Sequence, residues 1–589
     1  MNSVLKGGEF LIKETDIQTN FIPEDLNEDQ NMIRASVREF VTNEVRVKGN
    51  ELQNQEELLA LAGQLGLLAA HIPEEYGGNP LDTHSNTLIS EELGRGNGSF
   101  STSLAAHTGI GMLPILYFGS EELKKKYLPG LSSGNLKASY CLTEPSSGSD
   151  ALSAKSQAKL SDDGKNYILN GQKMWISNAG FADIFIVFAQ VDGTKFTGFL
   201  VEKGTPGLTL GAEEHKLGIK GSSTRQVFLE NVRIPVDQVL GEVGKGHLIA
   251  FNVLNIGRYK LGTMAMGGCK ICITEAVKYA NERIQFDQPI SSFGAIKYKL
   301  AEMAIRTFVA ESTVYRVSDL MDDKKNEELN LGRNYAQAML ESAEEYAVEC
   351  AIIKIYGSEV LDYVADELLQ IHGGNGFSEE YVPARVYRDS RINRIYEGTN
   401  EINRMLIINM ILKRTMKGAL DLVGPAWEVQ KELTGMPKME IPEGTYGLEW
   451  RTVKDFKKLT LMVAGAAVKY QLDGKHDLKD QQELLLNVAD MMIDLYNSES
   501  IILRVEKLTS NYSSENLDAQ IAMMKVYLWD AQSRLVKNAQ DALASFATGD
   551  ELRIMMMGIK RFARYEAVNV KELRRTVANK IIAANEYCF

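Results

Sequence analysis

Residues 183–202, DIFIVFAQVDGTKFTGFLVE, decide the fold class of this chain. Two apolar runs rich in aromatic and β-branched residues flank an Asp-Gly dipeptide, which favours a hairpin turn because Gly tolerates positive φ. Similar β-rich runs, NYILNG at 166–171 and RQVFLENVRI at 225–234, lie on either side. We therefore predict a central antiparallel β-domain over residues 137–245.

Helical patterns surround this segment on both sides. Apolar residues spaced three and four apart predict an N-terminal α-domain over residues 27–136 and a second α-domain over 246–412. Residues 413–450 concentrate Gly and Pro and are predicted to form a linker. A last periodic block over 451–589 predicts an extra all-α C-terminal domain. The predicted fold class is α+β, because the chain lacks the βαβ alternation of a doubly wound parallel sheet.

Composition and charge exclude several classes of protein. The chain has 589 residues, a formal net charge of −13 and a pI of about 5.3, which disfavours nucleic acid as a partner. Its five cysteines are too few for a disulfide framework, so a reducing compartment is expected. The N-terminal stretch lacks the apolar core of a secretory signal, and no apolar run is long enough to span a membrane. We expect a cytoplasmic enzyme of bacterial type.

Three short patterns imitate functional motifs. CKIC at 269–272 is a CxxC, but a zinc site needs a second pair or suitably spaced histidines, so we interpret it as core packing and expect no metal. GLSSG at 130–134 follows a helical pattern rather than a strand, which argues against a nucleophile elbow. GEVGKG at 241–246 lacks the Ser or Thr that follows the lysine of a phosphate-binding loop.

Three segments carry residues suited to chemistry. YCLTEPSSGSDA at 140–151 is a loop rich in hydroxyl groups, and QIHGGNGF at 370–377 has glycines that allow close approach of the backbone to a ligand. RIYEGTNEI at 394–402 places Glu397 between an aromatic residue and glycine, where burial would raise its pKa and suit it to general-base catalysis. Taken singly, each has a plainer interpretation: a surface loop, a helix C-cap with a turn, and a solvated glutamate before a helix capped by Thr399.

Together, the three segments resemble the signatures of the acyl-CoA dehydrogenase family, over roughly residues 30–412. The first two match the two family signatures, and RIYEGTNEI matches the loop that carries the family's catalytic glutamate. WISNAGFADIF, LNIGR and RIQFDQPI also resemble the very-long-chain branch, whose members have a helical C-terminal extension. The resemblance implies that the domain over 246–412 is a four-helix bundle.

The resemblance also implies a mechanism. FAD accepts a hydride from the β-carbon of a fatty acyl-CoA while Glu397 removes the α-proton, which gives a trans-2-enoyl-CoA in fatty-acid β-oxidation. An electron-transferring flavoprotein then takes the electrons. The backbone N–H of Glu397 and a ribityl hydroxyl of the flavin polarise the thioester oxygen. Relatives that lack a glutamate at this position carry it where this chain has Gly257, which supports Glu397 as the base.

The same resemblance assigns residues to the cofactor. FAD would be held within one subunit by Tyr140, Leu142, Thr143, Ser149, Trp175, Ser177, Thr399 and Glu401, and from the neighbouring subunit by Arg283, Phe286, Gln370 and Gly374. Trp175 has a plainer alternative as a core aromatic residue. Two positions depart from relatives: Gly294 replaces a Gln that contacts FAD in shorter-chain members, and Glu401 also stands where some relatives have Gln.

Substrate contacts are assigned in the same way. The acyl-CoA would contact Ala106, Ser149, Asn255, Arg258, Tyr396 and Gly398, with Asn255 and Arg258 at the CoA moiety. Medium-chain relatives have a glutamate at the pocket floor, where this chain has Ala106. A small apolar floor leaves room for a longer alkyl chain, and each buried CH₂ contributes about 0.8 kcal/mol. The resemblance therefore implies a preference for long-chain substrates.

Partners and rival functions also come from the resemblance. The C-terminal block implies a homodimer and leaves peripheral attachment to a membrane open. One relative of the very-long-chain branch is a scaffold for a respiratory complex, and another rival is a flavin oxidase on the same fold. A DNA-associated relative exists as well, but the acidic balance of this chain disfavours that function.

Overall fold

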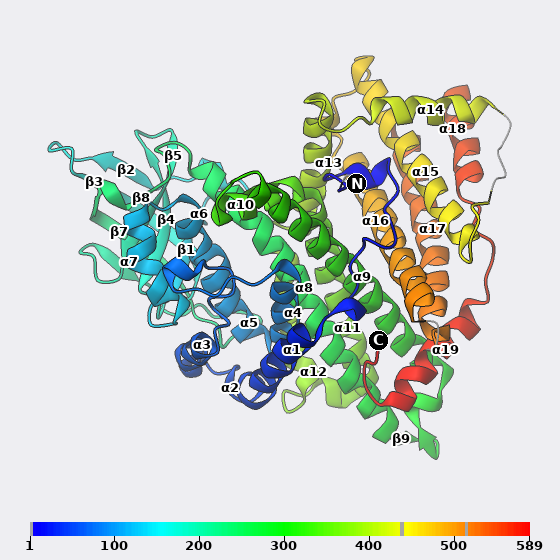
Figure 1. The fold of residues 1–589 in the computed structure, drawn as a ribbon, viewed down its shortest axis with the longest axis horizontal. Helices are drawn as coiled ribbons and strands as arrows, with labels where there is room; N and C mark the ends of the chain where they lie inside the picture. Colours follow the sequence, from blue (N-terminus) through cyan, green and yellow to red (C-terminus); the bar gives the residue numbers. More distant parts are fainter. Residues whose placement is uncertain (1–3, 436–440, 513–515) are drawn as a thin grey trace.

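The computed structural model describes residues 4–435, 441–512 and 516–589. A β-domain occupies one end of the molecule, long helices fill the middle, and the C-terminal helices form the opposite end (Figure 1). The predicted α+β architecture, with helical domains before and after the sheet and an extra helical domain at the C-terminus, is confirmed.

The N-terminal α-domain consists of short helices whose starts are set by local caps. Asn27 and Gln30 form a capping box at the start of α1, and the Asp82 carboxylate accepts the Ser85 N–H (2.7 Å) at the start of α4. A π-helical turn, Ala106–Gly111, interrupts the chain between α5 and α6. The helices are α1 (Glu28–Phe40), α2 (Arg46–Lys48), α3 (Gln55–Gln64), α4 (Thr83–Gly94), α5 (Gly98–Ala105), α6 (Leu113–Phe118) and α7 (Glu121–Ser132).

The central sheet has the strand order β6-β7-β3-β2-β4-β5-β8. Most neighbouring strands are antiparallel, as predicted: β2–β3, β3–β7, β4–β5, β5–β8 and β6–β7. In addition, β4 pairs in parallel with β1 and β2. Every residue of β4 is buried, which is typical of strands in parallel pairings. The strands are β1 (Ala138–Cys141), β2 (Gln157–Leu160), β3 (Asn166–Ser177), β4 (Ile184–Val191), β5 (Lys195–Glu202), β6 (Leu208–Leu210), β7 (Thr224–Pro235) and β8 (Val239–Leu240).

Long helices form the middle of the molecule. Helices α8 and α11 approach so closely that a Cβ on Gly262 would lie 2.3 Å from Ile353 Cγ2, and α9 and α13 complete the bundle. A hairpin of β9 (Ile284–Gln285) and β10 (Gln288–Pro289) projects between α8 and α9. The helices are α8 (Gly246–Glu282), α9 (Gly294–Asn330), α10 (Tyr335–Glu345), α11 (Ala347–His372), α12 (Val382–Ser390) and α13 (Asn400–Met416).

The predicted linker over 413–450 contains a helix. Helix α14 (Val423–Thr434) packs on α15, because its apolar residues recur with helical spacing despite the nearby Gly and Pro. Residues 436–440 of this linker lie outside the described residues. The C-terminal block comprises α15 (Gly447–Leu472), α16 (Gln482–Asn511), α17 (Asp518–Phe546), α18 (Gly549–Phe562) and α19 (Val570–Ala584), and α16 and α19 pack against α9.

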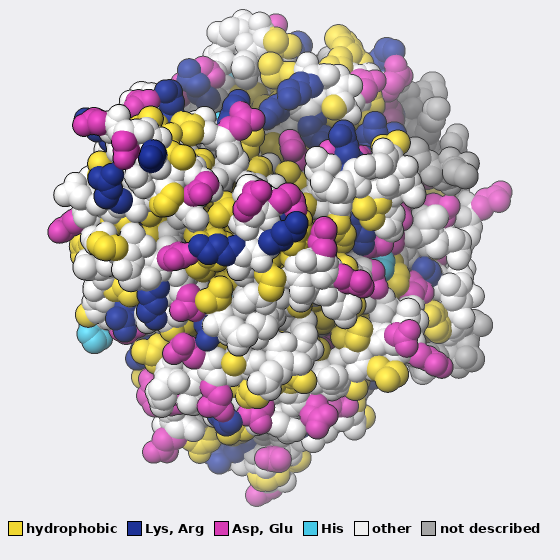
Figure 2. All heavy atoms as spheres, turned by 60° about the vertical axis from the view of Figure 1, so that its left-hand side comes forward, with side chains coloured by type: hydrophobic (Ala, Val, Ile, Leu, Met, Phe, Trp, Pro, Cys, Tyr) yellow, Lys and Arg dark blue, Asp and Glu magenta, His cyan; other side chains and the backbone are white. Residues whose placement is uncertain are grey.

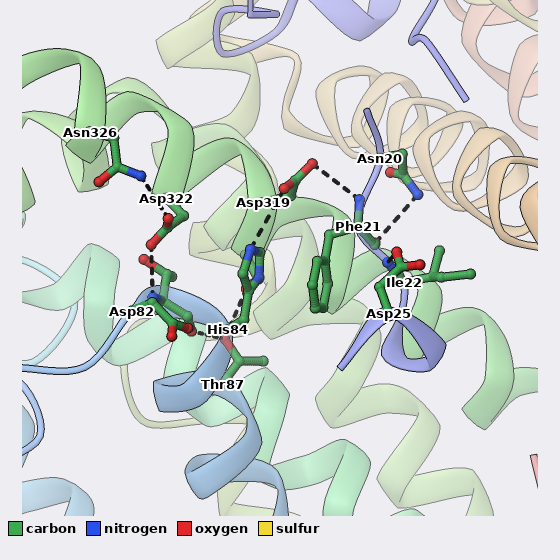
Figure 3. Close-up of polar contacts among 12 residues, drawn as sticks. Asn20, Phe21, Ile22, Asp25, Asp82, His84, Thr87, Asp319, Asp322 and Asn326 are labelled. Carbon is green, nitrogen blue, oxygen red and sulfur yellow. Dashed lines mark hydrogen bonds and ion pairs between the residues drawn. The ribbon is translucent and has the colours of Figure 1, made fainter. Parts of the chain in front are cut away.

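A segment before α1 joins the N-terminal domain to the long helices (Figure 3). The Phe21 ring stacks on His84 of α4 with 3.8 Å between ring centroids, and its backbone N–H donates to Asp319 Oδ2 of α9 (3.1 Å). Burial and then the neighbouring Asp323 raise the pKa of Asp319 to about 7. Sequence periodicity gave no prediction for this segment.

The three short patterns that imitate functional motifs lie in or next to helices. Cys269 and Cys272 are buried free thiols inside α8, Gly130–Gly134 spans the end of α7, and Gly246 begins α8. Within the described ranges, no cluster of metal-binding side chains occurs and no helix is both long and apolar enough to cross a membrane. The face in Figure 2 mixes basic and acidic side chains.

Candidate active site

Glu397 lies in a strained loop between the short helix Arg391–Arg394 and α13. Its φ of 57° is left-handed, and Gly398 follows with a φ of 79°. Such strain in a non-glycine residue is found at functional sites where the surroundings enforce it. Here Arg258 Nε donates to the Glu397 carbonyl (3.3 Å), and Lys354 Nζ donates to the Gly398 carbonyl (2.7 Å). Asn403 Nδ2 donates to both carbonyls, so three side chains fix the loop.

The Glu397 carboxylate is suited to accept a proton. Its Oε2 atom is enclosed and has no hydrogen-bond partner among the described residues. Burial raises the pKa of Glu397 to about 7, although Arg258 and then Lys354 favour the charged form. A Cβ added to Gly257 would stand 2.7 Å from Oε2, so only glycine leaves room for the carboxylate on that side. A poised carboxylate of this kind fits general-base chemistry near neutral pH.

A cavity of about 250 Å³ runs from Glu397 along one face of α8. Small residues leave it open, and Ala106, in the π-helical turn, and Tyr396 also line it. The α8 residues on this wall include Gly257, Lys260, Leu261, Met264, Gly268, Ile271 and Glu275. At about 1.5 Å per residue, the wall from Gly257 to Glu275 is roughly 27 Å long. The cavity therefore fits an extended apolar chain.

The edge of the β-domain adjoins this cavity. Trp175 on β3 has a φ of 61° and is 54% exposed, which excludes the alternative that it is a core residue. The Met174 N–H donates to the Thr143 carbonyl (2.9 Å), which places the hydroxyl-rich loop beside Trp175. Ser177, two residues on, lines the cavity itself. An exposed indole and neighbouring hydroxyl groups beside a cavity fit a planar, polar ring system such as a flavin.

The predicted FAD residues fall into two groups in the structure. Tyr140 is buried, Leu142, Thr143, Ser177 and Thr399 are half-buried, and Ser149, Trp175 and Glu401 are exposed; Thr399 and Glu401 belong to the start of α13. Arg283, Phe286, Gln370 and Gly374 lie on the surface and are absent from the cavity wall. No neighbouring atom lies within 4 Å of a Cβ built on Gly374, so its surroundings are open. Their contribution to a neighbouring subunit's FAD stays a prediction.

The predicted substrate residues are also spread over two environments. Ala106 and Tyr396 line the cavity, and Gly398 belongs to the fixed loop. Asn255 and Arg258 are buried, and Arg258 Nη1 donates to Asn255 Oδ1 (2.7 Å) while Nε holds the Glu397 carbonyl. Arg258 thus positions the Glu397 loop, and its predicted contact with the CoA moiety stays a prediction.

Sequence reasoning missed three residues that shape this site. Lys354 holds Gly398 and Asn400, while a buried pair between Lys173 and Glu144 (2.6 Å) anchors the hydroxyl-rich loop to β3. A signal existed for Lys354, because it is a single charge in the apolar run AIIKIYG. Buried charges of this type persist only when they are paired or hydrogen-bonded, so a lone lysine in an apolar helix indicates a polar partner from another segment.

Comparisons with known proteins agree with this geometry. Acyl-CoA dehydrogenase family models match the chain as an N-terminal domain at 27–135, a middle domain at 139–232, and C-terminal domains at 244–412 and 455–561. A probable acyl-CoA dehydrogenase of Bacillus subtilis (strain 168) is 45% identical over 99% of this chain and 98% of its own length. The very long-chain specific acyl-CoA dehydrogenase of Bos taurus mitochondria is 35% identical over 91% of this chain and 84% of its own.

Solved structures give the same result. The crystal structure of an acyl-CoA dehydrogenase complexed with FAD from Bacillus anthracis has a TM-score of 0.95 and 44% identity, covering 99% of this chain and 100% of that one. Butyryl-CoA dehydrogenase from Megasphaera elsdenii, at 35% identity and a TM-score of 0.59, covers 66% of this chain and 99% of its own. The chain belongs to the acyl-CoA dehydrogenase family.

Proposed function

We propose that this FAD-dependent acyl-CoA dehydrogenase oxidises long-chain fatty acyl-CoA, with Glu397 as the base that removes the α-proton. The observation that carries the proposal is the Glu397 carboxylate: it stands unpartnered, among the described residues, at the head of a long apolar cavity, with its pKa raised to about 7 by burial. The carboxylate is therefore basic enough to take a proton at neutral pH, and its Oε2 atom is enclosed by protein.

The loop that carries Glu397 also supplies a donor for the thioester. No described residue accepts a hydrogen bond from the Glu397 backbone N–H, while its carbonyl is occupied by Arg258 and Asn403. A thioester oxygen placed at this N–H would gain negative charge as the α-proton leaves, and one such donor contributes about 3–4 kcal/mol to the transition state. Bound FAD supplies the acceptor for the β-hydride.

The length of the cavity limits the length of the acyl chain that it can hold. The hydrocarbon core of a bilayer is about 30 Å thick, and the acyl chains of one leaflet span half of it. The wall along α8 is roughly 27 Å long, which is longer than such an acyl chain. The Bos taurus relative is a very long-chain specific enzyme, and this likeness supports the same preference here. Small residues along the path, including Ala106 and Gly268, keep the cavity open beyond the first carbons.

The chain-length test uses anaerobic reduction of the flavin by butyryl-, octanoyl- and palmitoyl-CoA. We expect palmitoyl-CoA to give the highest kcat/KM and the fastest loss of the flavin visible band. A clear optimum at butyryl-CoA would overturn the long-chain proposal. Hydrogen peroxide formed in air at the turnover rate would favour the oxidase alternative, and a flavin that no acyl-CoA reduces would favour the scaffold alternative.

We also propose an electron acceptor and an oligomeric state. An electron-transferring flavoprotein takes the electrons, and its addition should sustain turnover that stops without it. The protein is a homodimer: α16 and α19 pack on α9, and the resemblance to the very-long-chain branch implies that such a block covers the surface used for further assembly. Light scattering that gives a tetramer mass would contradict the dimer.

A further inference from the structure

Lys260 is a charged residue on the wall of a mainly apolar cavity. It lies on the cavity wall of α8 and is only 6% exposed. No hydrogen bond or ion pair joins its ammonium group to another described residue. By contrast, Arg46 at the far end of the cavity pairs with Glu275 (2.8 Å). A buried cation without a partner destabilises the protein, so a pocket for an unsubstituted acyl chain gains nothing from it.

The surroundings of Lys260 carry no compensating negative charge among the described residues. Burial alone lowers the pKa of Lys260 to about 7. Burial disfavours the protonation of His71 and His107, and Lys260 adds to this effect on the pKa of both. His107 is fixed as a neutral ring, since Nε2 bonds the Leu131 carbonyl (3.0 Å) and Nδ1 accepts the Ala138 N–H (3.2 Å). This part of the cavity is therefore ready to receive an anion.

We propose that Lys260 makes the acyl cavity a site for acyl-CoA that carries a carboxylate on the acyl chain, which pairs with the lysine ammonium. The substrate class is the CoA monothioester of a dicarboxylic acid. This inference rests on the proposed function, because it assumes that the acyl chain extends from Glu397 along α8. Arrival of the carboxylate restores the charge of Lys260 and gives the buried cation its missing partner.

The site of proton removal restricts where along the chain the carboxylate can be. Lys260 is three residues, about 4.5 Å along the helix axis, from Gly257, which lies against Glu397. Because the α-carbon must lie at Glu397 for proton removal, we expect the carboxylate to pair with the ammonium best at one chain length. An unsubstituted chain has no such restriction, because it can continue past Lys260 toward Glu275.

The test compares two series of CoA thioesters with equal carbon numbers. The dicarboxylyl series consists of adipoyl-, suberoyl-, sebacoyl- and dodecanedioyl-CoA. The matched unsubstituted series consists of hexanoyl-, octanoyl-, decanoyl- and dodecanoyl-CoA. For each substrate, kcat/KM is measured with wild type, Lys260→Met and Lys278→Met. Lys278 lies on the same helix but is exposed and off the cavity wall, so it is the matched control. FAD content and melting temperature verify that each variant is folded.

We expect a maximum at one length in the dicarboxylyl series of wild type and of Lys278→Met. At that length Lys260→Met should lose tenfold or more in the ratio of kcat/KM for the dicarboxylyl substrate to kcat/KM for the matched unsubstituted substrate. If Lys260→Met does not fold, Lys260→Gln is used, and titration calorimetry with the dicarboxylyl-CoA of that length should show a loss of affinity.

Two outcomes would overturn this inference. One is a wild type that oxidises the unsubstituted series but none of the dicarboxylyl series. The other is a lysine variant in which both series change equally or not at all. A wild type that no unsubstituted acyl-CoA reduces would instead contradict the proposed function, so the two failures are distinguishable.

Discussion

Gly257 lies directly against Glu397: a Cβ on Gly257 would stand 2.7 Å from Glu397 Oε2 and 3.0 Å from its Cδ. Helix α8 therefore leaves a one-carbon gap that the carboxylate occupies. Because the contact is with the end of a side chain that can move, an alanine at this position should displace the carboxylate rather than unfold the helix. The position of the base is thus set by a residue that has no side chain of its own.

We expect Gly257→Ala to slow flavin reduction by palmitoyl-CoA at least tenfold, because misplacement of a catalytic group by about 1 Å can cost 100-fold. Its melting temperature should be unchanged or higher, since alanine favours a helix interior over glycine by about 0.5–1 kcal/mol. Gly465→Ala, in the interior of α15, is the matched control and should leave the rate unchanged. An active Gly257→Ala would show that this contact does not position the base.

The rate of flavin reduction should rise with pH through about 7. Burial raises the pKa of Glu397 to about 7, and only the carboxylate can accept a proton, so activity is lost as the pH falls below that value. Arg258 and Lys354 hold this pKa down, so Arg258→Gln should move the midpoint to higher pH. Stopped-flow rates from pH 5.5 to 9 measure it, with the exposed Arg553→Gln as control. A flat profile, or a midpoint that moves to lower pH, contradicts this assignment.

Ala106→Leu should restrict the enzyme to substrates with shorter acyl chains. Ala106 is 5% exposed and lines the cavity, so added methyl groups would obstruct a long chain. We expect kcat/KM for palmitoyl-CoA to fall tenfold or more, while butyryl-CoA, which ends before the obstruction, serves as the internal control. Equal losses with both substrates would instead indicate general damage to the fold.

Arg504 joins the C-terminal block to the rest of the molecule through buried charges. It donates to Glu311 of α9 (2.8 Å) and to Glu24 of the N-terminal segment (2.7 Å). Removal of one partner from a buried ion pair costs about 3–5 kcal/mol, so Arg504→Met should lower the melting temperature by several degrees. Arg553→Met, on the surface of α18, is the control and should have little effect.

The pH dependence of stability provides a second readout for this network. Burial would raise the pKa of Glu311, but Arg504 and Lys270 outweigh it and hold the pKa at about 2. A carboxylate with a lowered pKa stabilises the folded state above its ordinary value of 4.5 and loses that contribution as the pH falls toward 2. Arg504→Met should reduce this loss. Identical acid unfolding of variant and wild type would contradict the network's role.

Local patterns made much of the fold predictable, while the proposed base came from a resemblance to a family motif. The apolar runs on either side of Asp192-Gly193 specify the β4–β5 hairpin, and RIYEGTNEI contains Glu397. The remaining parts depend on contacts between distant segments. Arg258 and Glu397 are 139 residues apart, so no local pattern indicates that one holds the other's backbone. The parallel pairing of β1 and β2 with β4 is likewise a property of the assembled sheet.

Composition gave no sign of one helix. The Gly and Pro of residues 413–450 predicted a linker, and within it α14 forms because packing on α15 stabilises its apolar face. The N-terminal segment is the converse case. Phe21 has no helical or strand pattern around it, but it is fixed by His84 and Asp319 from two separate helices.

The most direct measurement of the central claim is anaerobic reduction of the flavin in wild type and in Glu397→Gln. Glutamine keeps the shape of the side chain but cannot take a proton, so FAD content and acyl-CoA binding should persist. With palmitoyl-CoA, wild type should lose its visible flavin band rapidly, and Glu397→Gln should keep it over the same time. Rapid bleaching in Glu397→Gln would show that another group removes the α-proton.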